Sequence, residues 1–511
     1  MRQYIKLFMF ISVLLLSACN EWLDVQQEGE IEADELYKDG EGYRAVLNKV
    51  YKLMAEPTFY GENLSYGMVD CMSQQYELTE ASNANSMFRS FMDFKYTDNG
   101  VQDKINSTWL KGFNVIANAN DLLQHLRNAS SDVFEYGEIE RNLLMGEAFA
   151  CRALVHFDLL RLFAPRLEDA GTETFVPYVE NYPDIHATSI AVQPFLEKVI
   201  TDLMEAKRLV AEFDTSTSGK LVNATVSARM SAAPVNNFEY DTFFAGRVYR
   251  LNYYSITALL ARVYQWAGKS EDAFNCAKEV TQYALNGEAF YSDNFSGMKV
   301  NDGHDITAFD QKSDYKITSN IVFAVYNKKA YDNTNLQTQF KPEHIAGTSG
   351  QNQYFVVKSS NFESRGADEM AADVRYKNMI FNAMGQYPVS GKYYIPSSNP
   401  ENAEHLMIMP VIRLTEMRYI MAEYYASIGE FSSAYEILND IRQERGLTAL
   451  SSTNSFNEFV SDLIEDARRE WVSEGQLFYL YKRLNAAFIK NGESHRLTRS
   501  EAILPLPSDQ K

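Results

Sequence analysis

The 511-residue sequence contains few cysteine, tryptophan and histidine residues, with 4, 4 and 7 copies respectively. The cysteines are Cys19, Cys71, Cys151 and Cys276, and no two of them form a C-x-x-C pair. This spacing excludes a zinc ribbon and a thioredoxin-type redox motif. Cys151 and Cys276 lie in helical patterns, where we expect them to pack as small buried apolar side chains.

Motifs of several enzyme classes are also missing, because the sequence has no nucleophile elbow, no P-loop and no H-E-x-x-H helix. The histidines are scattered, and the helical setting of His156 is more typical of a packing residue than of a metal ligand. The stretch NDGHD at residues 301–305 has oxygen and nitrogen donors but lacks EF-hand spacing, so no metal is assigned. A glycosidase with two carboxylates stays open as an alternative, because 68 acidic residues are present.

Basic residues are outnumbered, with 48 Lys and Arg against 68 Asp and Glu, which gives a net charge of −20. A polyanion such as nucleic acid is therefore a poor general partner, because its binding depends on basic side chains that displace counterions. Aromatic residues are abundant instead, with 32 tyrosines and 31 phenylalanines. Tyrosine combines an apolar face with a polar tip, which suits contact with sugars or peptides, although core packing accounts for most of these rings.

The sequence begins with a hydrophobic run at residues 7–18, after Arg2 and Lys6. This run is shorter than the roughly 20 residues that a membrane-spanning helix needs, and it fits the apolar region of a signal peptide. The tetrapeptide Leu-Ser-Ala-Cys that ends at Cys19 resembles the bacterial lipobox. We expect cleavage after residue 18 and acylation of Cys19, with residues 20–30 as a tether. The alternative is a plain secretory peptide with a chance cysteine.

The pattern of apolar residues is mostly helical. The expected helices span residues 102–126, 138–163, 192–211, 248–267, 271–285, 413–428, 431–445 and 456–485. Two helix pairs share a register in which Ala261, Tyr264, Gly268 and Ala273 align with Ala422, Tyr425, Gly429 and Ala434. Small residues at the helix contact and a glycine at the turn are typical of a tetratricopeptide unit. The two copies are 161 positions apart, so they do not form a contiguous array.

Two long stretches interrupt the helices. Residues 286–409 are rich in Asn, Asp, Ser, Gly, Tyr and Phe and contain short β-like runs at 319–327 and 354–360. Residues 59–98 are similarly aromatic and irregular. Long loops inside a helical frame are uncommon and usually functional. We therefore expect one domain at residues 19–511, with a helical frame at about 39–285 and 410–485 and a ligand-face insertion at about 286–409.

Several segments, in order along nearly the whole chain, resemble the SusD/RagB family of outer-membrane lipoproteins. They are CNEWLDVQ at 19–26, GEAFACRALVHFDLLRLFA at 146–164, ADVRY at 372–376, IRLTEMRYIMAEYYASIGEFSSAYEILNDIRQERGL at 412–447, LIEDARREWVSEGQLFYLYKRLN at 463–485 and ILPLPSDQ at 503–510. One departure is that Leu477 and Leu480 stand where the family commonly has an Arg and an Asp. A joint change of this kind is typical of a structural ion pair replaced by an apolar pair. We interpret the charged residues of the other motifs in the same way, as buried or partner-facing pairs: Glu147, Arg152, Arg413, Glu416, Glu423 and Glu474.

The resemblance implies a mainly α-helical fold of tetratricopeptide-like helix pairs, an α/α superhelix with long irregular loops and a few short strands. It further implies a surface-exposed, lipid-anchored outer-membrane protein without catalysis or cofactor. Such a protein captures a glycan, as in starch or polysaccharide utilisation, and delivers it to a SusC-like TonB-dependent β-barrel. Capture of peptides, as in RagB-like members, is the alternative within the same fold.

Motif matching carries over no ligand residue, because the binding loops of the family vary. Sugars offer C–H faces and hydroxyl edges, so we predict that loop aromatics, amides and charges form the site, with loop packing as the alternative for each residue. The candidates are Tyr60, Asn63, Tyr66, Tyr76, Arg89, Asp93, Tyr96, Tyr291, Asp293, Phe295 and Tyr354.

Overall fold

The computed structural model describes residues 33–78, 86–184, 186–224, 239–293, 309–310, 314–342 and 354–507. The expected lipidation residue Cys19, the candidate Phe295 and the NDGHD stretch lie outside these ranges. Within the described ranges, no helix has the length and apolar character needed to cross a membrane.

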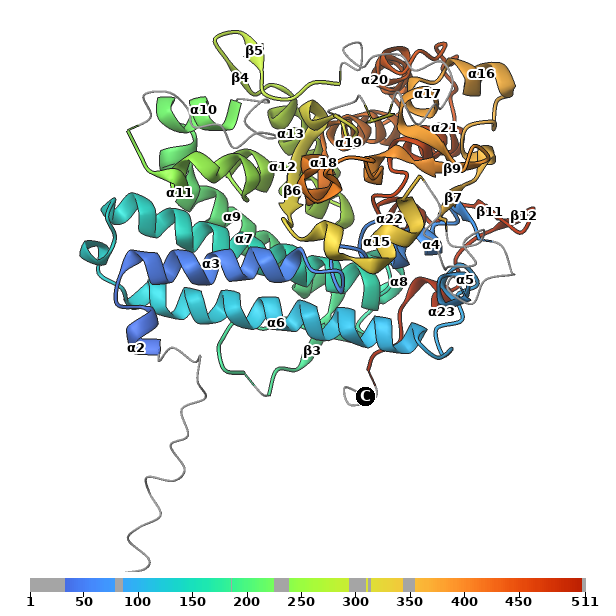
Figure 1. Ribbon diagram of the computed structural model, residues 1–511. Helices are drawn as coiled ribbons and strands as arrows, with labels where there is room; N and C mark the ends of the chain where they lie inside the picture. Colours follow the sequence, from blue (N-terminus) through green and yellow to red (C-terminus); the bar gives the residue numbers. More distant parts are fainter. Residues whose placement is uncertain are drawn as a thin grey trace, which may run out of the picture.

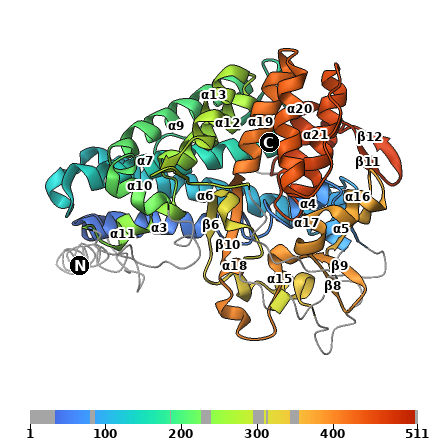
Figure 2. The same cartoon turned by 90° about the horizontal axis from the view of Figure 1, so that it is seen from above.

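The frame of the molecule is a row of long helices that pack side by side in the order in which the chain visits them (Figures 1 and 2). The row consists of α3 (Gly40–Met54), α6 (Val101–Asn128), α7 (Gly137–Phe163), α9 (Val192–Asp214), α12 (Tyr253–Trp266), α13 (Ser270–Thr281), α19 (Leu414–Ser427), α20 (Phe431–Glu444) and α21 (Phe456–Glu470). Each helix contacts the next one, and α7 is buried along nearly its whole length. The mainly helical fold class predicted from the sequence is confirmed.

The close approach of neighbouring helices depends on small residues. A Cβ atom on Gly146 of α7 would lie 2.6 Å from the Val210 side chain of α9, so only glycine fits this contact. In the two predicted repeats, Ala261 and Ala422 are completely buried at the contacts within their pairs. The turn residues Gly268 and Gly429 have φ angles of 69° and 85°, which glycine adopts without strain. The helix α13 packs against α19, so the two repeats, although far apart in sequence, are neighbours in space.

The prediction of a single helix at residues 456–485 is wrong, because the chain turns between α21 and α22 (Leu477–Leu484). Ser473 and Gly475 both have positive φ angles within this turn. The Gly475 amide donates a hydrogen bond to Asp70 Oδ1 at 2.8 Å, and a Cβ atom at position 475 would lie 2.2 Å from the Leu64 carbonyl oxygen. Close contact with the N-terminal loop therefore breaks a pattern that is helical in its local sequence.

The insertion between the two repeats folds into short strands and helices on one flank of the helix row (Figure 2). Its strands β6 (Ile321–Tyr326) and β10 (Ile408–Arg413) pair antiparallel. A small sheet has the order β1-β7-β9-β8 and joins Tyr76–Glu77, Val356–Val357, Tyr387–Ser390 and Ile380–Ala383. The helices of this flank are α15 (Thr334–Phe340), α16 (Ala367–Ala372), α17 (Val374–Met379) and α18 (Glu404–Met407).

The remaining elements are short and lie at the ends of the row or between its helices. The helices are α2 (Ala33–Leu36), α4 (Met68–Met72), α5 (Ser86–Met92), α8 (Leu167–Ala170), α10 (Thr217–Ala224), α11 (Thr242–Ala245) and α23 (Arg499–Ala502). The paired strands are β2 (Thr174–Pro177) with β3 (Ser189–Ala191), β4 (Ala284–Leu285) with β5 (Glu288–Ala289), and β11 (Phe488–Lys490) with β12 (Glu493–His495).

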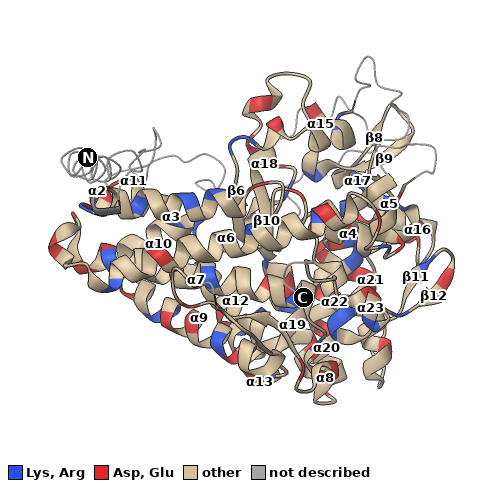
Figure 3. Ribbon diagram, turned by 90° about the horizontal axis from the view of Figure 1, so that it is seen from below, with Lys and Arg blue, Asp and Glu red and all other residues tan. Residues whose placement is uncertain are grey.

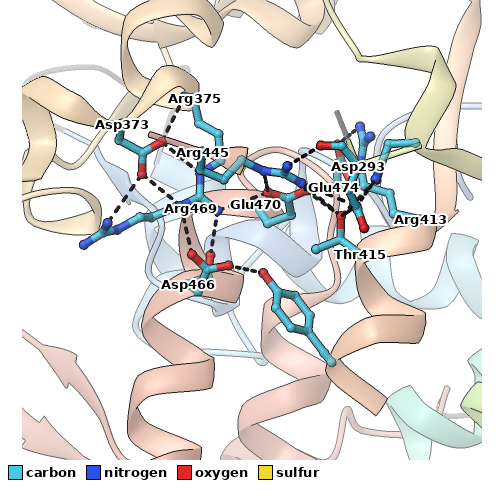
Figure 4. A network of polar contacts seen from close by, with 12 residues as sticks. Asp293, Asp373, Arg375, Arg413, Thr415, Arg445, Asp466, Arg469, Glu470 and Glu474 are labelled. Carbon is cyan, nitrogen blue, oxygen red and sulfur yellow. Dashed lines mark hydrogen bonds and ion pairs between the residues drawn. The ribbon is translucent and has the colours of Figure 1, made fainter. Parts of the chain in front are cut away.

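A buried network of charges joins the insertion to the C-terminal helices (Figure 4). Glu470 of α21 accepts hydrogen bonds from Arg445 at 2.8 Å, from Arg375 at 3.0 Å and from Thr415 at 2.8 Å. Burial alone would raise the pKa of Glu470, but the arginines outweigh it and hold the pKa well below its usual range. The carboxylate therefore stays ionised and fixes three separate segments in one arrangement.

The charged motif residues interpreted from the sequence as ion pairs are confirmed as such. The pairs are Glu147 with Arg247, Arg152 with Asp202, Glu416 with Arg262, Glu423 with Arg483, and Glu474 with Arg413. Leu477 and Leu480 are buried, as expected for an apolar replacement of a pair. Acidic and basic residues are interspersed along the frame (Figure 3).

Candidate functional site

The two stretches that interrupt the helical pattern meet at an open pocket of about 510 Å³. Its floor consists of Glu62, Asn63, Lys104, Asn333 and Asn335, and we call it the amide pocket after its three asparagines. The first two residues come from the loop after α3, Lys104 comes from the first turn of α6, and the last two begin α15. The floor thus joins the N-terminal loop to the insertion.

The Glu62 carboxylate organises the floor. It accepts hydrogen bonds from Asn333 Nδ2 at 3.1 Å and from Asn335 Nδ2 at 3.0 Å, and it forms an ion pair with Lys104. Lys104 also donates to Asn63 Oδ1 at 2.9 Å. Only 1% of the Glu62 side chain is exposed, so both of its oxygens are engaged by the protein. A buried carboxylate with this many partners fixes the positions of the amides around it.

Local sequence explains the positions of Asn333 and Asn335. Asn333 precedes the first residue of α15, and its side-chain oxygen accepts the Asn335 amide hydrogen at 2.9 Å, which is an N-cap. The Asn333 Nδ2 group also donates to the Tyr66 hydroxyl at 3.0 Å. The third amide of the floor, Asn63, donates through Nδ2 to Thr108 Oγ1 of α6 at 2.8 Å. Each amide is therefore held by a helix end or a buried hydroxyl.

The rim of the pocket is more accessible than its floor. Pro57, Asp103 and Thr334 are exposed, and Met87 and Ser107 are half-buried. The rim thus offers a carboxylate, two hydroxyls and apolar contacts. Because Lys104 is neutralised by Glu62, the uncompensated charge at the rim is that of Asp103. This arrangement can bind a neutral molecule with many hydroxyl groups and repels an anionic one.

All six tyrosines proposed from the sequence as ligand contacts are buried in the core. Exposed fractions between 0 and 6% are found for Tyr60, Tyr66, Tyr76, Tyr96, Tyr291 and Tyr354. Their hydroxyls bond inside the protein: for example, Tyr60 donates to Asp158, and Tyr96 donates to the Glu501 carbonyl at 2.6 Å. A ring in this position has no free face for a sugar, so we do not carry these residues into the proposal.

The other candidates are spread over three places. Asn63 belongs to the floor of the amide pocket. Arg89 is half-buried on α5, and the exposed Asp93 forms an ion pair with Lys95 at 2.8 Å. Asp293 is 92% buried, accepts from Asn320 Nδ2 at 2.6 Å and pairs with Arg418, so it belongs to the charge network of Figure 4.

Metal ligation finds no support in the described part of the chain, where no three His, Cys, Asp or Glu residues come together. His156 is completely buried, accepts the Val179 amide hydrogen at 3.0 Å and stacks on Tyr178, and its burial lowers its pKa. The interpretation of His156 as a packing residue is confirmed.

Comparison with known families identifies the family of the chain. A family profile described as "SusD family" matches residues 229–488, just over half of the sequence. A second profile, described as "Starch-binding associating with outer membrane", matches residues 21–233. The chain belongs to the SusD family.

Relatives and solved structures agree with the SusD family assignment. SusD-like protein P38 of Formosa agariphila is 22% identical over 525 residues, covering 98% of this chain and 95% of that protein. A SusD superfamily protein from Bacteroides thetaiotaomicron has a TM-score of 0.65 and 18% identity, covering 92% of this chain and 97% of the other. A structure described as a laminarin binding SusD-like protein has a TM-score of 0.60 and 17% identity, covering 93% of this chain and 97% of the other. At these identities the structural likeness establishes the shared SusD fold.

The sequence pattern indicated only Asn63 of the amide pocket, because aromatic side chains dominate the loops and were the expected sugar contacts. Glu62, Lys104, Asn333 and Asn335 were not proposed. A usable signal was present in Asp-Asn-Thr-Asn at 332–335, where an asparagine cap and a second amide stand together inside the insertion. No signal in the sequence pairs Glu62 with residues more than 270 positions away.

Proposed function

We propose that this SusD family member is a glycan-capture protein that binds a neutral oligo- or polysaccharide at the amide pocket. The observation that carries the proposal is the set of fixed amides around Glu62, placed where the N-terminal loop meets the insertion. Neutral sugars present several hydroxyl groups, each of which both donates and accepts a hydrogen bond. The amide hydrogens of the floor are engaged by Glu62, Tyr66, Thr58 and Thr108, so the Asn335 side-chain oxygen and the rim groups Ser107, Thr334 and Asp103 supply the sugar contacts.

Two further points support the proposal. A protein with the same fold is described as laminarin binding. The acidic rim residue Asp103 and the net charge of −20 favour a neutral glycan over one rich in uronic acids or sulfate. Catalysis by a carboxylate pair is not part of the proposal, because both oxygens of Glu62 are occupied by protein donors.

The cellular role that we propose follows the expectation from the sequence. The lipidated Cys19 anchors the protein at the cell surface in the outer membrane. The bound glycan then passes to a SusC-like TonB-dependent transporter for import. The family profile that names the outer membrane supports this location.

Binding of residues 20–511 to a panel of glycans and peptides, measured by calorimetry and affinity electrophoresis, tests the proposed ligand class. We expect a neutral glycan to bind, and we expect Asn335→Ala to weaken it by about 2- to 10-fold, the effect of losing one net hydrogen bond of about 0.5–1.5 kcal/mol. Asn114→Ala is the matched control, because Asn114 is exposed on α6 and does not line the pocket, so we expect its affinity to match that of the wild type.

The outcomes separate the alternatives. If Asn335→Ala and Asn114→Ala have the same affinity for a neutral glycan, the binding site lies outside the amide pocket. Binding of peptides alone would assign the protein to the peptide-capturing, RagB-like branch. Preferential binding of acidic glycans would contradict the charge argument based on Asp103.

A further inference from the structure

A second pocket, of about 430 Å³, lies where the N-terminal loop, the insertion and the C-terminal helices meet. Its walls come from the segment that joins α4 to β1, the turn after β7, the helices α21 and α22, and the β11–β12 hairpin (Figure 1). It shares no lining residue with the amide pocket. We call it the cationic pocket after Lys358 and Arg468, which line it.

Both cations of this pocket lack an ion-pair partner. Among the described residues, no carboxylate oxygen lies within 4.0 Å of the side-chain nitrogens of Lys358 or Arg468. The next residue, Arg469, shows the contrasting arrangement, because it pairs with Glu369 at 2.7 Å. Arg468 instead reaches the uncharged Tyr481 hydroxyl. The positive charges at the pocket are therefore left for a ligand to neutralise.

The electrostatics of the walls favour an anion over water. Lys358 is half-buried, and burial lowers the pKa of its ammonium group; the exposed Glu77 opposes this effect, and the nearby Arg468 adds to it. Two cations against the single carboxylate of Glu77 leave the lining with a net positive charge. Water can solvate these groups but cannot cancel the repulsion between them, whereas a monoanion does both.

The turn that carries Lys358 is fixed to the N-terminal loop. The Lys358 amide donates to the Gln75 carbonyl oxygen at 3.1 Å, and Asn361 Nδ2 donates to the same oxygen at 3.0 Å. Between these two anchors, the serines at 359–360 are exposed, and their hydroxyls make no hydrogen bond with a described residue. Ile489 of the hairpin, 54% exposed, adds apolar surface. The pocket thus offers hydroxyls and an apolar contact beside its cations.

We propose that the cationic pocket binds a sugar acid, a hydroxylated molecule of monosaccharide size with one carboxylate. Arg468 and Lys358 bind the carboxylate, because charge-assisted hydrogen bonds to a guanidinium and an ammonium are the strong kind. The serines at 359–360 bind the hydroxyl groups of the sugar. A volume of about 430 Å³ exceeds what a lone ion needs and lies in the range of about 300–1,000 Å³ that is typical of small-molecule sites.

Calorimetry of residues 20–511 with sodium glucuronate tests this site, with glucose and sodium acetate as reference ligands. Glucose lacks the carboxylate and acetate lacks the hydroxyl groups, so we expect each to bind at least about tenfold more weakly than glucuronate. Added sodium chloride should weaken glucuronate binding, because salt screens the attraction. Acetate that binds as tightly as glucuronate would overturn the assignment of a sugar acid.

Variants locate the binding. Lys358→Gln and Arg468→Gln each remove one cation, and each should weaken glucuronate binding by about tenfold or more. Neither cation has an ion-pair partner to lose, so both variants should melt at or above the wild-type temperature. Lys220→Gln is the matched control, because it removes the same charge from a half-buried position on α10 outside the pocket.

Asn335→Ala separates this site from the proposed glycan site. It should leave the affinity for glucuronate unchanged, because Asn335 lines only the amide pocket of the two. A loss of glucuronate binding in Asn335→Ala, or an equal affinity in wild type, Lys358→Gln and Arg468→Gln, would overturn the proposal for the cationic pocket. Neither outcome bears on neutral glycans, whose binding is measured separately.

Discussion

The buried acidic residues of this protein have two roles, which depend on whether cationic side chains surround them, and this difference decides what a single substitution does. Glu470 and Glu474 of the network in Figure 4 keep their charge in the core, because arginines and a lysine hold their pKa values below the usual range against the opposing effect of burial. Asp70 behaves in the opposite way. It is completely buried on α4, and burial raises its pKa to about 7 although the Gly475 amide and the Tyr76 hydroxyl favour the ionised form.

Asp70 therefore gives the protein a pH dependence with a definite sign. The pKa of an unfolded aspartic acid is about 3.9, so between roughly pH 4 and pH 7 the folded chain binds more protons than the unfolded chain. The free energy of unfolding then falls as pH rises through this window. Asp70→Asn cannot ionise but still accepts from Gly475, so we expect it to become more stable than the wild type by up to about 4 kcal/mol at pH 8.

Urea unfolding at pH 4.5, 6 and 8 measures this difference. The difference in unfolding free energy between Asp70→Asn and the wild type should increase as pH rises. The corresponding difference for the control Asp93→Asn, at an exposed position, should be the same at all three pH values. A gap of the same size at all three values would show that Asp70 does not titrate in this range.

The roles of some single residues could be predicted from the sequence, and those of others could not. The pairing of Glu147, Arg152, Arg413, Glu416, Glu423 and Glu474 was predictable, because charges inside helical motifs must be neutralised where they are buried. The burial of Tyr60 or Tyr66 was not predictable, because tyrosine has the same local pattern in a loop core as on a ligand face. Three-dimensional contacts with Asp158 and Asn333 decide between these roles.

At the scale of elements, the sequence predicts helices well and their interruptions poorly. The register of Ala261 and Gly268 with Ala422 and Gly429 was visible because helix contact and turn require small residues at fixed spacing. The helix α3 was not singled out, and the break after Glu470 was missed. This break is imposed by the N-terminal loop, in which Leu64 and Asp70 contact Gly475, and periodicity carries no information on contacts across more than 400 residues.

Substitutions of Gly268 and Gly475 compare a turn with free space around it and a turn in contact with another segment. At Gly268 a Cβ atom meets nothing within 4 Å, so Gly268→Ala costs only the strain of a positive φ angle, about 1–2 kcal/mol. At Gly475 the φ angle is similar, but the Cβ atom would collide with the backbone oxygen of Leu64 at 2.2 Å. We expect Gly475→Ala to lower the free energy of unfolding by more than about 3 kcal/mol, measured by urea denaturation. Equal losses for the two variants would mean that the α21–α22 turn moves freely away from the N-terminal loop.

At the scale of the whole molecule, the helix row presents the insertion on one flank (Figure 2). The residue expected to carry the anchor, Cys19, precedes the described part of the chain. The family and its outer-membrane association follow from the profiles, whereas lipidation rests on the sequence Leu-Ser-Ala-Cys alone. Acylation of Cys19 with two or more chains would give stable attachment, since each buried methylene contributes about 0.8 kcal/mol and one chain alone binds reversibly.

Cys19→Ala tests the lipid anchor. The experiment uses a Gram-negative host that lacks the cognate transporter, because contact with that protein could otherwise hold the variant at the membrane. The wild type is expected in the membrane fraction with an intact mass that includes acyl chains. The variant is expected either as soluble protein or as an uncleaved precursor, because the lipid is attached to the thiol before cleavage. Cys276→Ala, a second cysteine that lies in the helical frame, should keep both lipid and membrane location. A correctly cleaved Cys19→Ala protein that still sediments with membranes would show that attachment comes from the folded domain and not from a lipid.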